Sequence, residues 1–248
     1  MLFEFYSLLP LLPLADIVFA FQESNVPGKA IVILLFSGSI VAWSIMVTKG
    51  MELKKARQTS ETFLKEFRRE EDPTAVFLRR RRFPESPLYR VYEAGCRGLG
   101  MEVDESGGGS ELFLGRTAPS TGALTRLQLE AVQNLTQRNV ADQALLLENH
   151  MGLLATAVSA SPFLGLLGTV WGVMEAFGSM AVKGSATLSA VAPGISAALL
   201  TTVVGLLVAL PSAVGYNLLT NMIRSLTVQT DNFAQEFESS IRRAFYRE

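Results

Sequence analysis

The chain has 248 residues, of which 49% are hydrophobic and 18% charged, with a mean hydropathy of +0.29. Soluble domains carry about 25% charged residues, and the net charge of −1 excludes a partner recruited by bulk charge, nucleic acid included. A single cysteine, Cys96, and a single histidine, His150, exclude a disulfide framework, a Cys/His zinc site and a His-paired nucleophile within one chain. We therefore expect no enzymatic activity, no catalytic residues, no metal and no cofactor.

Long stretches of the chain carry no charged residue. Between Met151 and Leu218 only Glu175 and Lys183 are charged, and residues 30–48 carry no charge at all. A helix needs about 20 apolar residues to cross a bilayer, and it pairs its own backbone groups there. A chain of this size is too small to surround three such helices in a soluble core. The sequence predicts an all-α membrane protein with three crossings, at residues 30–48, 151–176 and 193–218.

The basic residues predict the orientation of these crossings. Twenty of the 22 Lys and Arg residues lie within residues 49–150 and 219–248, which the positive-inside rule assigns to the cytoplasm. Residues 49–150 are then a cytoplasmic helical domain and 219–248 a cytoplasmic C-terminal helix. The N-terminal segment 1–29 and a short loop at 177–192 lie on the opposite side.

Residues 2–21 are apolar but ambiguous. They lack a basic region and a small-residue cleavage site, which argues against a signal peptide. Pro10, Pro13, Glu4 and Asp16 argue against a fourth crossing. We expect an amphipathic segment on the outer membrane surface.

The remaining pattern is helical. Apolar residues recur at helical spacing from Leu53 until Asp72-Pro73, and residues 100–119, with three consecutive glycines, predict a connection. A second pattern starts at Thr121 and, after Gly122, meets no Gly or Pro before Gly152, so we expect this helix to continue into the second crossing. The basic run Arg79–Arg82 has no stacking aromatics beside it and is interpreted as a solvated face near anionic lipid.

The second and third crossings carry small and hydroxyl-bearing side chains rather than purely apolar ones. Small residues at four-residue spacing let helices approach closely; they are Gly168 with Gly172, Gly194 with Ala198, and Gly205 with Ala209. Pro193 is expected to begin the third crossing, where its missing N–H costs nothing. Each hydroxyl could bond to its own helix or line a polar path.

Ionisable groups are absent from these two helices away from their ends. Ion pathways usually use such groups, so a conducting protein would need its titrating acid from a partner. Glu175, near the outer mouth, is interpreted as an interfacial, solvated residue.

Three segments together carry a resemblance: SPFLGLLGTVWGVMEAF at 161–177, TLSAVAPGISAALLTTVVGLLVALPSAVGY at 187–216 and DNFAQEF at 231–237. They closely resemble the MotA/TolQ/ExbB proton-channel family, its TolQ members most, and the order of crossings and loops agrees over the whole chain. The resemblance implies a multi-pass protein of the bacterial inner membrane, with residues 1–29 and 177–192 in the periplasm.

The resemblance also implies partners and a mechanism. Such subunits form a homopentamer around two copies of a TolR/ExbD-like one-span protein, whose membrane Asp takes up and releases protons and drives rotation. Thr169 and Thr202 match the two pore threonines of the family, and Thr201 and Ser196 are expected beside them. Family members usually carry Glu where this chain has Ala197, so that acid is missing here.

Two functions from different classes follow. The first is a stator subunit that converts the proton-motive force into motion. The second is a membrane scaffold that assembles an envelope complex and conducts nothing. A self-sufficient transporter fits less well, because substrate sites need more than hydroxyls at mid-membrane.

Overall fold

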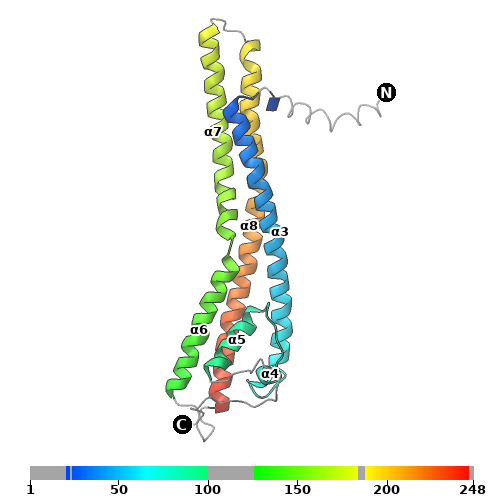
Figure 1. Cartoon of the computed structure of the whole chain (residues 1–248), viewed down its shortest axis with the longest axis vertical. Coiled ribbons are helices and arrows are strands. Elements are labelled where there is room, and N and C mark those ends of the chain that lie inside the picture. The colour runs from blue at the N-terminus through cyan, green and yellow to red at the C-terminus, as the bar shows by residue number, and fades with distance from the viewer. Residues whose placement is uncertain (1–20, 23, 100–125, 184–187, 246–248) are drawn as a thin grey trace, which may run out of the picture. The chain divides into compact units, whose positions relative to one another are not determined.

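The computed structural model describes residues 21–22, 24–99, 126–183 and 188–245, and every regular element among them is a helix (Figure 1). The helices are α3 (Val26–Phe67), α4 (Ala75–Leu78), α5 (Pro87–Gly98), α6 (Arg126–Glu148), α7 (Met151–Lys183) and α8 (Leu188–Phe245). The predicted all-α class is confirmed for this part of the chain. The surface segment predicted at 2–21 falls almost wholly outside the described residues, and the connection at 100–119 does so entirely.

Three of the described helices are long and apolar enough to cross a membrane: α3, α7 and the part of α8 from Val191 onward. This agrees with the three crossings predicted from the uncharged runs. The side of the membrane on which each loop lies stays a prediction. The chain divides into two compact units: unit 1 comprises residues 1–47 and 150–217, and unit 2 comprises residues 48–149 and 218–248.

The expected continuous helix from the cytoplasmic domain into the second crossing is wrong. The helix α6 ends at Glu148, and α7 begins at Met151. Between them His150 adopts a left-handed backbone with φ of 68°, and the Asn149 N–H donates to the Leu146 carbonyl in a tighter turn. Asn and His enter this backbone region more readily than most residues. The break therefore lies at residues other than Gly or Pro, the two types on which the prediction relied.

The second and third long helices extend beyond the predicted crossings. The helix α7 continues to Lys183 and α8 begins at Leu188, so most of the loop expected at 177–192 is helical. Only residues 184–187 of that stretch lie outside the described chain. Pro193 accordingly lies inside α8 rather than at its first turn. The prediction that Pro193 begins its helix was wrong because it equated the start of the helix with the start of the apolar run. A helix can continue past the bilayer where the sequence permits.

Unit 2 is built around an aromatic core. Phe63 and Phe67 from α3 meet Tyr89 and Tyr92 from α5, and all four are buried. The C-terminal part of α8 adds Phe233 and Phe237 to the same cluster. Most of these ring pairs are tilted or edge-to-face, the arrangements that the aromatic quadrupole favours. The buried Tyr92 hydroxyl accepts the Phe77 N–H at 3.0 Å, so this polar atom is satisfied inside the core.

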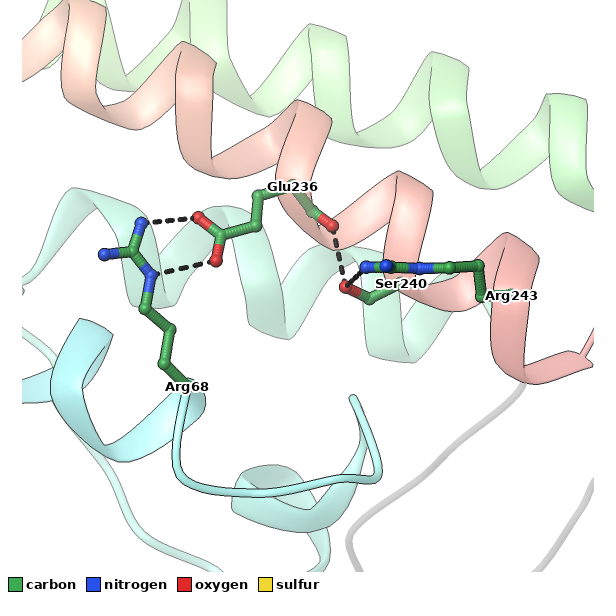
Figure 2. Close-up of polar contacts among 4 residues, drawn as sticks. All are labelled: Arg68, Glu236, Ser240 and Arg243. Atoms are coloured by element: carbon green, nitrogen blue, oxygen red, sulfur yellow. Dashed lines mark hydrogen bonds and ion pairs between the residues drawn. The ribbon is translucent and has the colours of Figure 1, made fainter.

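Polar contacts add links between segments of unit 2 that are distant in sequence. The Arg68 guanidinium donates two hydrogen bonds to the Glu236 carboxylate, at 2.9 and 2.8 Å (Figure 2). This pairing raises the pKa of Arg68 further. The Lys49 side chain, which is 4% exposed, pairs with Glu52 at 3.1 Å and donates to the Leu146 carbonyl at 3.4 Å. A buried ammonium needs such partners, and Lys49 thereby fastens the last turn of α6 to α3.

Candidate functional site

Glycines on α7 bring α8 into backbone contact. A Cβ atom on Gly165 would lie 2.9 Å from the Thr201 carbonyl oxygen and 2.9 Å from the Thr202 Cα. A Cβ on Gly172 would lie 2.6 Å from the Ala198 Cβ, and one on Gly168 would strike the Thr201 side chain. On α8, a Cβ on Gly205 would lie 2.6 Å from the Ser161 carbonyl oxygen. At each position only a hydrogen fits, and the two helices touch along this line.

These contacts define the register of the pair. Residue numbers on α7 rise from Ser161 to Ala176 while those of their neighbours on α8 fall from Gly205 to Gly194, so the helices run antiparallel. The structure thus places the predicted packing residues Gly168, Gly172 and Gly205 in the interface. Gly194 has a looser fit, since a Cβ added there would lie 3.3 Å from the Ala176 Cβ. Dispersion and close backbone approach hold such a pair together in lipid, where the hydrophobic effect contributes little.

The close approach at Gly165 gathers three threonine hydroxyls on one backbone oxygen. The Oγ1 atoms of Thr169, Thr201 and Thr202 lie 3.0, 2.9 and 3.1 Å from the Gly165 carbonyl oxygen. Thr169 and Thr202 also hydrogen-bond to each other across the helix pair. Two residues predicted as pore threonines and one of their expected neighbours therefore form a single cluster.

The numbers of donors and acceptors in this cluster allow more than one hydrogen-bond arrangement. A carbonyl oxygen has two lone pairs, and in a regular helix one of them accepts the N–H four residues on. Thr201, fully buried, has a second acceptor in the Ala198 carbonyl at 2.7 Å. Thr169 and Thr202 then share the remaining lone pair. One donates to Gly165, and the other donates either to its neighbour or to a third group.

The other hydroxyls of these helices differ from the cluster. Ser196 is exposed on α8 and makes none of these contacts. Thr156, Ser159, Ser161 and Ser212 each donate to a carbonyl of their own helix, the pattern of simple packing. Among the hydroxyls of α7 and α8 named here, those at Gly165 are the ones that bond across to the neighbouring helix.

A second polar group lies toward the other end of the pair. The Asn25 side chain accepts the Gly28 N–H at 2.8 Å, which caps the start of α3, and its amide donates to Glu175 on α7. Glu175 and Ala197 line the same cavity, which has a volume of about 160 Å³. Glu175, interpreted from the sequence as a solvated interfacial residue, is exposed on α7 and accepts this hydrogen bond from the residue that precedes α3.

Sequence reasoning missed Asn25 and Gly165. Asn25 precedes an apolar run with Pro27 two residues later, the signal of a helix start. Gly165, Gly168 and Gly172 follow an i, i+3, i+7 spacing that puts them on one helix face. Both signals were present, but neither names the partner on the other helix.

Fold and site together define a helical protein with three helices able to cross a membrane, two of which pack through glycines around shared threonine hydroxyls. The model of the MotA/TolQ/ExbB proton channel family matches residues 113–232. The chain belongs to this family, since its similarity to characterised members extends over nearly their whole length.

Two kinds of relative are similar to the chain. The Tol-Pal system protein TolQ of Haemophilus influenzae is 30% identical over 233 residues, covering 90% of this chain and 92% of the relative. TolQ of Pseudomonas aeruginosa is 27% identical, covering 90% of each. The biopolymer transport protein ExbB of Salmonella typhimurium is 30% identical over 216 residues, covering 83% of this chain and 78% of the relative.

Proposed function

We propose that this chain is the stator subunit of an ion-driven motor in the bacterial inner membrane. The observation that carries the proposal is the threonine cluster: Thr169 and Thr202 hydrogen-bond to each other over the Gly165 carbonyl. Family membership supports it.

The proposed assembly is a homopentamer whose α7 and α8 helices surround the single transmembrane helices of a TolR/ExbD-like dimer. Within the predicted crossings 151–176 and 193–218, the first carries one carboxylate, Glu175, and the second carries none. The acid that titrates beside the threonines is therefore an Asp on the partner. Its proton uptake and release drive rotation and transmit force to the cell envelope.

The threonines have a defined task in this mechanism. When the partner's Asp is charged, the hydroxyl that is not engaged with Gly165 turns and donates to it. A hydrogen bond to a carboxylate away from water is worth about 1.5–3 kcal/mol. The pair can also reverse its direction, since Thr169 and Thr202 are both within reach of the same carbonyl, and a reversible hydroxyl pair can relay a proton.

The decisive experiment removes the hydroxyls and keeps their shape. We expect the double variant Thr169→Val/Thr202→Val to assemble with the partner but to lose about ten- to a hundredfold in proton flux, the rate equivalent of about 1.5–3 kcal/mol. Flux is measured with a pH-sensitive dye in vesicles that contain the complex, and assembly by co-purification.

Two controls make the result specific. Thr156→Val removes a hydroxyl that bonds only to the Gly152 carbonyl of its own helix, and should leave flux unchanged. Thr202→Ser keeps the hydroxyl and should retain most of it. Full flux in the double variant would refute the proton path. A complex that assembles but conducts nothing in any form would favour the scaffold.

A further inference from the structure

The threonine cluster has one inner member and two outer members. The inner member is Thr201, which is 0% exposed. Thr169 and Thr202, called the outer pair below, are both half-buried. The burial of Thr201 comes from this chain alone, and a partner helix that packs against the pair adds cover without removing any. Thr201 therefore does not touch the partner's acid, whereas the outer pair has surface with which to do so.

The Thr201 side chain is fixed by its packing, but its hydroxyl hydrogen is not. A Cβ atom on Gly168 would lie 2.7 Å from the Thr201 Cβ and 2.9 Å from its Cγ2, so Thr201 occupies the space that this glycine leaves. From this position the Thr201 Oγ1 lies 2.7 Å from the Ala198 carbonyl oxygen and 2.9 Å from the Gly165 carbonyl oxygen. A hydroxyl hydrogen rotates about its C–O bond. Thr201 can therefore change its acceptor without moving a heavy atom.

The choice that Thr201 makes decides what the outer pair must do. Both acceptor carbonyls lie inside helices, where one lone pair accepts the backbone N–H four residues on and one remains for a hydroxyl. While Thr201 donates to Ala198, the remaining lone pair of Gly165 is filled only if a member of the outer pair donates to it. When Thr201 itself donates to Gly165, the outer pair is released from this carbonyl.

We propose that Thr201 is a positioning residue for the outer pair: its hydroxyl turns from the Ala198 carbonyl to the Gly165 carbonyl when the outer pair aligns on the partner's acid. In the aligned state one outer hydroxyl donates to the other, and the second donates to the carboxylate. The three hydroxyl hydrogens then make three hydrogen bonds, as many as before Thr201 turns. Consecutive hydrogen bonds polarise and strengthen one another. The inference rests on the proposed function and adds the residue that lets the pair leave its carbonyl.

The test compares two variants that differ only in the hydroxyl. Thr201→Ser and Thr201→Ala both lose the methyl group that packs against Gly168. In Thr201→Ala, alignment of the outer pair leaves a lone pair of Gly165 unfilled, which costs one neutral hydrogen bond of about 0.5–1.5 kcal/mol. We therefore expect proton flux about two- to twelvefold lower in Thr201→Ala than in Thr201→Ser, with equal co-purification of the partner.

A control removes a buried hydroxyl of the same helix that lies outside the cluster. Ser212 is 2% exposed and donates to the Val208 carbonyl of α8. Ser212→Ala should leave the flux unchanged, which separates the effect at Thr201 from a general loss of buried hydroxyls.

A second measurement uses the full chain alone, without flux. The Gly165 carbonyl is labelled with ¹³C and observed by NMR in lipid nanodiscs, since hydrogen bonding moves a carbonyl resonance downfield. In Thr169→Val/Thr202→Val neither outer hydroxyl remains, so Thr201 should donate to Gly165. Adding Thr201→Ala to this double variant should move the resonance upfield relative to adding Thr201→Ser.

The two measurements separate this inference from the proposed function. Equal flux in Thr201→Ser and Thr201→Ala, in a complex that conducts, overturns the inference and leaves the proposed function standing. Equal Gly165 resonances in the two triple variants overturn the inference whatever the flux. A wild-type complex without flux defeats the proposed function, and the resonances then decide alone whether Thr201 turns to Gly165.

Discussion

At the scale of single residues, burial in unit 2 keeps two titratable side chains neutral. Cys96 and Tyr92 lie fully buried in the core of unit 2. Burial raises the pKa of the Cys96 thiol to about 12 and raises the pKa of the Tyr92 hydroxyl as well. Both therefore stay neutral at physiological pH, which makes Cys96 a packing residue rather than a nucleophile.

These raised pKa values predict that the folded chain loses stability at alkaline pH. A group whose pKa is raised by folding holds its proton more tightly in the folded chain, so the free energy of unfolding falls as the pH rises above the unfolded value. For Cys96 this window runs from 9.0 to about 12. We expect denaturant midpoints, followed by circular dichroism, to fall over this range, and less steeply in Cys96→Ala. Equal slopes in the two proteins would contradict the assignment.

At the scale of elements, the α7–α8 interface depends on missing side chains. Gly205 faces the Ser161 carbonyl, whereas a Cβ on Gly178 of α7 would meet nothing within 4 Å. The two glycines therefore have opposite roles, although each lies inside a long helix. One permits contact with a neighbour, and the other only lowers helix propensity.

A pair of identical substitutions separates these roles. Gly205→Ala should lower the stability of the helix pair by about 1–3 kcal/mol, because the methyl group forces the helices apart. Gly178→Ala should raise stability by up to about 1 kcal/mol through helix propensity. Thermal unfolding in detergent measures both. A stable, fully assembled Gly205→Ala protein would mean that the observed contact is not needed.

How much could be predicted from sequence differs between elements. The three crossings and the pairing of Gly168, Gly172 and Gly205 follow from local composition and spacing, because a bilayer imposes length and close packing demands small residues. The convergence of Thr169, Thr201 and Thr202 on Gly165 does not follow. It depends on the offset between two antiparallel helices, which neither helix encodes alone.

At the scale of the whole molecule, the distribution of basic residues predicts the membrane topology. Twenty of 22 Lys and Arg lie in two segments, which the positive-inside rule places in the cytoplasm. The same rule places residues 177–192 outside. Cys96 is the single cysteine of the chain and is buried. A Cys96→Ala chain therefore has no thiol that could give background labelling, and reporter cysteines can be introduced into it.

We expect a membrane-impermeant maleimide to label Ser185→Cys in intact spheroplasts and to label Ser239→Cys only after permeabilisation. Labelling is read as a mass shift on gels, with the cysteine-free chain as control. The reverse pattern would contradict the predicted topology.

The Asn25 side chain has a consequence beyond its two hydrogen bonds. The same amide group starts α3 and restrains Glu175, so unwinding the first turn of α3 also frees the carboxylate. By linkage, whatever releases the carboxylate must loosen that turn equally. Hydrogen exchange at the Gly28 amide therefore reports whether Asn25 still holds Glu175.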